Sequence, residues 1–428
     1  MLAKLILFIS SMTYRKFKAD YLFTGRTMAA PDTVLITSEN GQVEAILPAT
    51  EAGEDIEYLP GIMSPGFVNC HCHLELSHMK GVLAEKTGLV DFLLSVMKHR
   101  NAPPSSPTGI ASDQVPELIR SAIAEAEEAM LHNGIVAVGD ICNTTDTLPQ
   151  KTDGRLYYHN FIETMGFIEQ KAPDRFAHSL KVFHAFAEAY SHPIEANSMV
   201  PHAPYSVSPR LFDTIANFPG NRILTIHNQE TEAENEFYKT GKGDFLRLYD
   251  AMGLDVSFYP GTGKRSLESY LPHFYRNQVL ILVHNVATTE EDLQFAITWR
   301  GKGPSDSIAA DHPSLYFCLC PNANLYISGQ LPDLDLLLRY NLPIVIGTDS
   351  LASNHQLSIL EELKTLQREF PHLSTNTLLQ WATLNGAQAL QMDPVLGSFS
   401  PGKQPGVLLI NHIEEGNFTK SSEVRRLI

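Results

Sequence analysis

The 428-residue sequence has no excess of basic residues and no long apolar run, and each absence argues against a class of protein. Lys and Arg number 32 against 48 Asp and Glu, and the resulting net charge of −16 argues against nucleic acid as a polymer partner. No segment approaches the roughly 20 apolar residues of a membrane-spanning helix. The apolar residues 1–12 do not make a convincing signal peptide. We interpret them as a spurious extension or an extra strand and expect a soluble, cytoplasmic protein.

Cysteine is also scarce, with five residues at positions Cys70, Cys72, Cys142, Cys318 and Cys320. The two Cys-x-Cys pairs could indicate a metal cluster, but both lie within apolar strand patterns. Free cysteine behaves as a small buried hydrophobe in a reducing compartment. We therefore predict that these thiols pack in the core and bind no metal.

Both ends of the chain have the pattern of short strands separated by turn residues. The expected strands span residues 20–23, 33–37, 42–47 and 407–410. Asn40-Gly41 stands between two of them and is typical of a hairpin turn. We expect residues 1–63 and 394–428 to pair into one small composite β domain, a β-sandwich, beside a central domain of residues 64–393.

The central part alternates apolar, β-branched runs with helical patterns. The expected strands span residues 67–71, 135–141, 156–162, 198–202, 223–227, 279–284, 315–320 and 343–347. The expected helices span residues 89–99, 116–132, 174–190, 210–217, 232–252, 290–299, 334–340, 357–370 and 376–391. Such alternation predicts an α/β fold with a parallel sheet, and eight units within roughly 330 residues fit a (β/α)8 TIM-like barrel. A doubly wound open sheet is the alternative, but the Gly-x-Gly-x-x-Gly loop that would favour it is missing after the first strand.

Polar residues gather where these strands end. His71 and His73 end the first strand, and because alternate residues point to opposite faces, both imidazoles lie on one side. Imidazole suits zinc and its neighbours. Later strand ends carry His202, His227 with Glu230, His284 and Asp349. Since the active site of a barrel lies at the carboxyl ends of its strands, these residues predict one shared site.

The motifs around these residues resemble the amidohydrolase superfamily, in its branch of nucleoside, guanine and related aminoheterocycle deaminases with the chlorohydrolases. The resemblance runs from Pro65 to Gly397, and the flanking β segments also fit. The motifs that carry it are Pro65-Gly66-Phe67-Val68-Asn69-x-His71-x-His73, Pro201-His202-x-Pro204-Tyr205, His227-x-x-Glu230 and Gly347-Thr348-Asp349-Ser350.

The resemblance implies one divalent metal, zinc as a rule and iron in some members, held by His71, His73, His227 and Asp349. Three imidazoles, a carboxylate and an open position for water are typical of a catalytic centre. Members with two metals carry a bridging lysine at the end of the fourth strand, where this sequence has His202 and no lysine nearby. One metal is therefore expected.

The resemblance also implies roles in the reaction. His284 would orient a hydroxide, Asp349 would take its proton, and Glu230 would deliver a proton to the substrate. The candidates for substrate binding are His202, Glu75 and Asn324. Structural alternatives stay open. Glu230 could begin a solvated helix, His202 could be hydrogen-bonded within a Pro-rich turn, and His284 could be a satisfied core histidine.

The leading hypothesis is hydrolytic deamination of an amino-substituted heterocycle, adenosine-like, purine or aminodeoxyfutalosine-like, with release of ammonia. The segment His73-Leu74-Glu75-Leu76-Ser77 loosely resembles aminodeoxyfutalosine deaminases. A second hypothesis keeps the site but breaks a C–Cl bond or another C–N bond. A third is a non-catalytic scaffold of the same fold, against which the complete ligand set argues. We expect a small-molecule substrate as the partner and no association with a membrane. Whether the protein forms a homodimer stays open.

Overall fold

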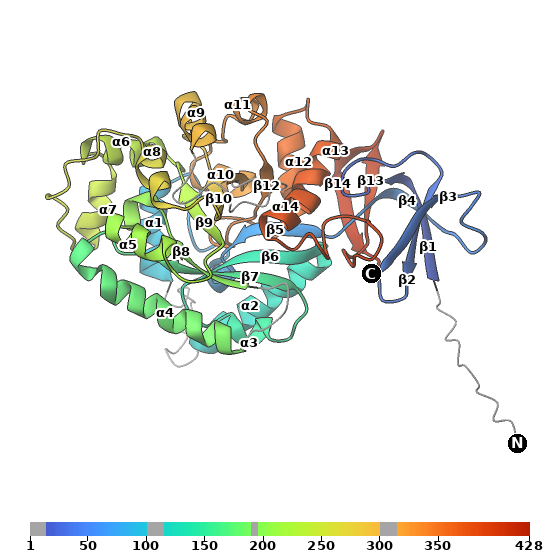
Figure 1. Ribbon diagram of the computed structural model, residues 1–428, viewed down its shortest axis with the longest axis horizontal. Coiled ribbons are helices and arrows are strands. Elements are labelled where there is room, and N and C mark those ends of the chain that lie inside the picture. Colours follow the sequence, from blue (N-terminus) through green and yellow to red (C-terminus); the bar gives the residue numbers. More distant parts are fainter. Residues whose placement is uncertain (1–13, 101–114, 190–195, 300–314) are drawn as a thin grey trace, which may run out of the picture.

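The computed structural model describes residues 14–100, 115–189, 196–299 and 315–428 (Figure 1). The strands are β1 (Tyr14–Leu22), β2 (Thr33–Ser38), β3 (Val43–Pro48), β4 (Glu57–Ser64), β5 (Phe67–Cys72), β6 (Ile135–Cys142), β7 (Tyr157–Thr164), β8 (Ala196–Pro201), β9 (Ile223–Asn228), β10 (Val279–His284), β11 (Leu315–Leu319), β12 (Ile344–Ile346), β13 (Leu408–Glu414) and β14 (Asn417–Arg426). The expectation for residues 1–12 falls outside the described residues.

Helices lie between the central strands and between β12 and β13. They are α1 (Leu89–His99), α2 (Val115–His132), α3 (Leu148–Lys151), α4 (Ala172–Ala189), α5 (Pro209–Ala216), α6 (Glu232–Thr240), α7 (Phe245–Ala251), α8 (Ser266–Tyr270), α9 (Glu290–Thr298), α10 (Pro321–Ile327), α11 (Leu334–Arg339), α12 (Ile359–Glu369), α13 (Thr375–Gln380) and α14 (Gly386–Ala389). Within the described residues, no helix combines the length and the apolar character needed to cross a membrane.

The eight central strands form two parallel sheets, ordered β5-β6-β7-β8 and β9-β10-β11-β12. All residues of β5, β6, β9 and β10 are buried, as expected of parallel strands covered on both faces. The predicted alternation of strands and helices with parallel pairing is thus confirmed. The five cysteines are free and buried, in agreement with their predicted packing role.

Backbone hydrogen bonds join the two parallel sheets at both of their edges. Beside β8, the His227 N–H donates to the His202 carbonyl at 3.0 Å. Beside β5, the N–H groups of Thr348 and Asp349 donate to the His71 carbonyl at 3.1 and 3.0 Å. We call these two places the seams. They bring the carboxyl ends of β5 and β9, and the residues after β12, to one end of the central region.

The two ends of the chain form one six-stranded mixed sheet, ordered β14-β13-β4-β1-β2-β3, at one side of the molecule (Figure 1). This pairing of the termini confirms the expected small sheet, and β2 and β3 form the hairpin predicted at Asn40-Gly41. β4 and β14 were missing from the sequence prediction. β4 contains Pro60 and Gly61, residues that sequence patterns associate with strand breaks, and yet it pairs with both β1 and β13.

The single helix predicted over residues 232–252 is wrong. The chain forms α6 and α7 instead, because Gly241 ends α6 in the left-handed conformation at φ 66° and Gly243 follows at φ 100°. Glycine adopts such angles without the steric penalty that other residues incur. This break redirects the chain after Glu230, so that α7 contributes to the wall of the cavity described below.

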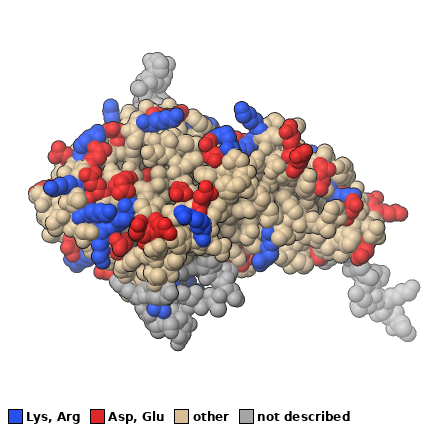
Figure 2. All heavy atoms as spheres, turned by 90° about the horizontal axis from the view of Figure 1, so that it is seen from above, with Lys and Arg blue, Asp and Glu red and all other residues tan. Residues whose placement is uncertain are grey.

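Acidic and basic side chains are interspersed over the face of the molecule shown in Figure 2. Outside the grey residues, that face carries no broad basic patch of the kind that binds nucleic acid. The view agrees with the acidic balance of the sequence.

Candidate active site

Three histidines and an aspartate meet at the carboxyl ends of the central strands. His71 is in β5, His73 follows it, His227 is in β9, and Asp349 follows β12. Asp349 Oδ1 lies 3.5 Å from His71 Nε2 and 3.5 Å from His73 Nε2. His73 Nε2 lies 3.2 Å from His227 Nε2. We call these four residues the histidine–aspartate cluster, and they are the four predicted from the sequence.

The cluster fits a divalent metal ion by its own hydrogen bonding. His71 is fully buried, yet neither of its ring nitrogens has a hydrogen-bond partner among the described residues. His227 Nδ1 donates to the His202 carbonyl at 2.7 Å, which leaves the Nε2 lone pair directed at His73. Buried polar atoms need partners. A cation bound by these lone pairs and the carboxylate would supply one.

Burial also favours the protonation state that metal ligands require. Burial lowers the pKa of His73 and of His227 well below the usual range, and neighbouring histidines lower both further. Both rings are therefore neutral near pH 7, with lone pairs available. Burial alone would raise the pKa of Asp349, but the imidazole of His71 and the adjacent histidines hold it well below its usual range.

The Gly-Thr-Asp motif has a steric reason. A Cβ added at Gly347 would come within 2.8 Å of His71 Cβ, so glycine allows the end of β12 to lie against β5. Asp349 adopts the left-handed conformation at φ 56°. Its Oδ2 accepts a hydrogen bond from Ser353 Oγ at 2.6 Å. These contacts fix the carboxylate so that Oδ1 points into the cluster.

His284 differs from His227 in its tautomer. Its Nδ1 accepts a hydrogen bond from Asn324 Nδ2 at 3.0 Å, so the proton of the neutral ring lies on Nε2. Burial lowers the pKa of His284 to about 4. Its Nε2 lies 3.7 Å from Glu230 Oε1. The ring is therefore placed to donate a hydrogen bond at the site.

Glu230 is buried beside this ring, just beyond β9. Burial raises its pKa well above the usual range, and the carboxylates of Asp349 and Glu234 raise it further. A raised pKa favours the protonated form of this carboxyl. The interpretation of Glu230 as an exposed residue opening a solvated helix is wrong, because only 6% of its surface is exposed.

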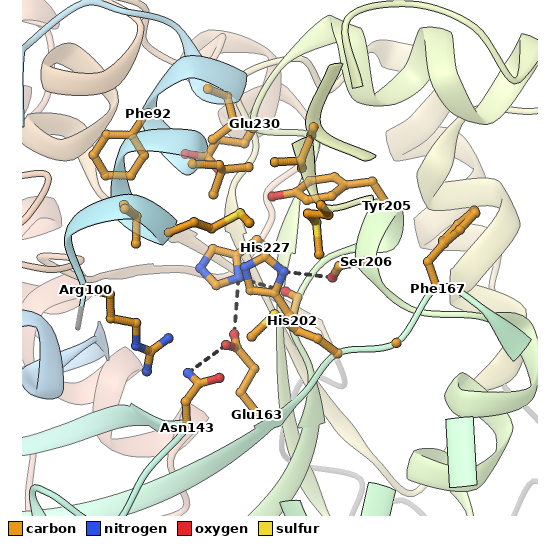
Figure 3. Close-up of a pocket in the computed structure, with 18 of the residues that line it drawn as sticks. Phe92, Arg100, Asn143, Glu163, Phe167, His202, Tyr205, Ser206, His227 and Glu230 are labelled. Atoms are coloured by element: carbon orange, nitrogen blue, oxygen red, sulfur yellow. Dashed lines mark hydrogen bonds and ion pairs between the residues drawn. The ribbon is translucent and has the colours of Figure 1, made fainter. Parts of the chain in front are cut away.

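One cavity of about 310 Å³ joins these residues (Figure 3). The predicted site residues that line it are His73, His202, His227, Glu230, His284 and Asp349. Most of the remaining wall is apolar and comes from α1, α7 and the segment after β7, with Phe92, Met97, Phe167, Tyr249 and Met252 among its residues. His202 Nδ1 lies 2.8 Å from Ser206 Oγ, which orients the His202 ring at the edge of the cavity.

Two predicted binding residues lie behind the cavity wall. Asn324, in α10, contacts His284 Nδ1 and is not part of the described lining. Glu75 is buried, forms an ion pair with Arg100, and accepts the backbone N–H groups of Asn143 and Thr144 at 3.0 Å each. Both side chains hold other groups in place, and their direct contact with a substrate stays a prediction.

Among the polar residues that line the cavity, sequence analysis missed Glu163, Asn143 and Arg100. Glu163 lies at the end of β7, and its Oε2 accepts a hydrogen bond from Asn143 Nδ2 at 2.9 Å. Burial raises the pKa of Glu163 to about 7. A signal was present, because Glu163 lies at the end of the third central strand and His202 directly follows the fourth. Arg100 follows α1, and no local pattern indicates which way its side chain points.

The chain belongs to the amidohydrolase family, whose sequence profile matches residues 62–422. It is 25% identical over 358 residues to the aminodeoxyfutalosine deaminase of a Nitratiruptor species, covering 82% of this chain and 79% of that protein. This confirms the resemblance seen in the motifs.

Solved structures show the same fold. The Helicobacter pylori aminofutalosine deaminase, in complex with methylthio-coformycin, superimposes with a TM-score of 0.74 at 21% identity, covering 95% of this chain and 94% of that one. The atrazine chlorohydrolase of Arthrobacter aurescens, complexed with zinc, has a TM-score of 0.67 at 17% identity, covering 92% and 86%. The fold is thus shared by deaminases and a chlorohydrolase.

Proposed function

We propose that this protein is a metal-dependent hydrolase that removes the amino group of an adenosine-like heterocycle and releases ammonia. The observation that carries the proposal is the convergence of the histidine–aspartate cluster, His284 and Glu230 on one cavity. Deamination needs a nucleophile, a hydrogen-bond donor and a proton donor within reach of one carbon atom. The deaminase activity of the Nitratiruptor relative supports the same class of reaction.

His71, His73, His227 and Asp349 would hold one divalent ion, with zinc favoured over iron. The zinc in the Arthrobacter chlorohydrolase structure supports this choice. A bound metal of this kind lowers the pKa of water and so supplies hydroxide near neutral pH. The residues around it determine where protons go.

Three side chains would carry the proton and charge steps. Asp349 Oδ1 faces both His71 and His73 and would accept the proton that water loses on attack. Glu230 would give its proton to a ring nitrogen, which makes the neighbouring carbon electrophilic, and would later help ammonia to leave. His284 would donate its Nε2–H to the oxygen that attacks. Asn324 keeps that proton on Nε2.

The proposal includes the architecture that supports the site. The two four-stranded sheets would form a (β/α)8 barrel closed at the seams, comprising residues 64–393. Residues 1–63 and 394–428 would form the second domain, in which the six-stranded sheet curls over its own apolar core as a small sandwich. Five free, buried thiols suit the reducing cytoplasm, where we propose that the protein acts.

A substrate screen with the purified protein tests the function. We expect about one equivalent of zinc by elemental analysis and ammonia release from one or more of adenosine, 5′-methylthioadenosine, aminodeoxyfutalosine and guanine. Chlorinated triazines, assayed for chloride, test the alternative leaving group. Chloride release without ammonia release would favour the chlorohydrolase hypothesis. Stoichiometric metal with neither product would contradict the proposed function.

A further inference from the structure

One corner of the cavity carries a hydrogen-bond acceptor that no described residue satisfies. We call Glu163, Asn143 and Arg100 the polar corner; they lie together on one side of His227 (Figure 3). Glu163 is 5% exposed, and its Oε2 accepts the Asn143 amide at 2.9 Å. Its Oε1 has no hydrogen-bond partner among the described residues. A buried carboxylate oxygen left without a donor is costly, which indicates that a ligand supplies one.

The polar corner is held rigidly from behind. The carboxylate of Glu75 forms an ion pair with Arg100 through Oε1, while its Oε2 accepts the backbone N–H groups of Asn143 and Thr144 at 3.0 Å. One buried carboxylate therefore fixes the guanidinium and the loop after β6 together. Asn143 in turn fixes the orientation of Glu163. Such support is what a binding site needs to keep its geometry.

The charges of the corner select a neutral group that both donates and accepts. Arg100 repels a cationic substituent, and the carboxylate form of Glu163 repels an anionic one. A hydroxyl group satisfies both, since it donates to the carboxylate and accepts from the guanidinium. A second metal ion fits poorly here. His227 Nδ1, 3.8 Å from Glu163 Oε1, already directs its proton at the His202 carbonyl and has no lone pair to offer.

The position of the corner shows which part of a substrate reaches it. Glu163 lies on the Nδ1 side of the His227 ring, whereas Nε2 on the other side faces the histidine–aspartate cluster. The carboxylate and the reaction centre are thus separated by the width of one imidazole. A group bound at Glu163 is therefore a substituent of the heterocycle and not the amino group that leaves.

We infer that Glu163, supported by Arg100, binds hydroxyl groups of a sugar attached to the heterocycle. The substrate is then a nucleoside, and not a free base or a chlorinated triazine. This inference rests on the proposed function for the location of the reacting carbon. It assigns Glu163 as a specificity-determining residue.

The test compares adenosine with 2′,3′-dideoxyadenosine, which lacks the two sugar hydroxyls. Wild-type protein, Glu163→Gln and Glu163→Ala are assayed for ammonia release and for binding of both nucleosides by calorimetry. We expect the wild type to prefer adenosine by about 10- to 100-fold, the usual worth of hydrogen bonds to a charged group. In Glu163→Ala the preference should fall below about threefold, with Gln intermediate.

Controls separate recognition from structural damage. Glu169→Gln changes an exposed carboxylate outside the described cavity lining and should keep the wild-type preference. Metal content and melting temperature of the Glu163 variants should match the wild type. A preference that persists in Glu163→Ala would overturn the inference. So would equal losses for both nucleosides, or loss of metal, because Glu163 would then act by positioning His227.

The remaining outcomes distinguish the two proposals. If the wild type binds adenosine in preference to the dideoxy compound but releases no ammonia, the proposed function fails and the sugar-binding corner stands. If the wild type deaminates adenine as efficiently as adenosine, the proposed function is supported and the inference of sugar binding at Glu163 is overturned. If neither nucleoside binds to the metal-loaded protein, the inference is overturned.

Discussion

Two buried polar clusters both take a residue from β7 and differ in their hydrogen bonding. In the lysine cluster, Lys151 Nζ contacts Asp140 Oδ2 at 2.5 Å and Asn160 Oδ1 at 2.7 Å, and every polar side-chain atom of these three residues has a partner. In the active site, both ring nitrogens of His71 and Oε1 of Glu163 have none among the described residues. A saturated cluster stabilises the fold, whereas an unsaturated one is built to receive ligands.

The lysine cluster nevertheless serves the site. Asp140 Oδ1 accepts the backbone N–H of Leu74, the residue that follows His73, at 2.8 Å. Lys151 neutralises the charge that this arrangement buries. The saturated cluster thus fixes the backbone from which one of the proposed metal ligands projects. The lysine cluster and the active site thus have different roles, and the lysine cluster supports the active site.

The largest effect is expected from removing a residue of the histidine–aspartate cluster. His71→Ala, His227→Ala and Asp349→Ala should each lose most of a single bound divalent ion and, with it, the activity. Melting temperature should also fall, since metal binding adds to folding stability. Elemental analysis measures the ion, with the exposed His132→Ala as the control. Two ions per chain, or undiminished metal in these variants, would contradict a mononuclear site.

Glu230→Gln tests the proton step while leaving the metal in place. The amide keeps shape and polarity but cannot carry the proton, so kcat should fall by roughly 10²–10⁴. Metal content and substrate binding should not change. Glu236→Gln, an exposed residue of the helix that follows, is the matched control. Turnover near the wild-type rate in Glu230→Gln would remove this residue from the mechanism, with Glu75 the next carboxylate to test.

Breaking the lysine cluster should lower the stability of the fold and leave metal binding unchanged. Lys151→Met leaves Asp140 buried and unpaired, which should lower the free energy of unfolding by about 3–5 kcal/mol. Lys181→Met, at an exposed position of α4, should change it by less than about 0.5 kcal/mol. Denaturant titration measures both. If Lys151→Met kept its stability but lost metal, the distinction between the clusters would be wrong.

The smallest effect is expected from the thiols beside the ligands. Cys72→Ala removes a buried sulfur between His71 and His73 and should cost about 1 kcal/mol in unfolding free energy, with full metal content. Cys318→Ala, on β11, is a comparison within the same core. Loss of metal on Cys72→Ala would make the thiol a ligand and overturn its assignment as a packing residue.

The sequence predicts the strands and the candidate site residues at their ends because both follow from local rules. His71 and His73 alternate along a strand, and the other candidates end later strands, so period and position suffice. The wall of the cavity does not follow from such rules. Arg100 and Glu163 line one cavity because Glu75 holds Arg100 and Asn143 holds Glu163, and these contacts join segments far apart in the sequence.

The missed elements have similar causes. Pro60 and Gly61 disguise β4, whose stability comes from pairing on both sides with β1 and β13. The break after α6 was visible as Gly241-x-Gly243, but the helical pattern on either side concealed it. Local preference was overridden by tertiary pairing in the first case and underestimated in the second.

The seams join catalysis to the durability of the fold. The carbonyls of His71 and His202 accept the backbone hydrogen bonds that hold the two parallel sheets together, so the residues that shape the site also fasten the strands. The amides of His227, Thr348 and Asp349 cannot exchange with solvent deuterium unless the strands separate. Opening of the site and opening of the central region are therefore one event. A ligand that holds the site closed should therefore also slow the opening of the central region.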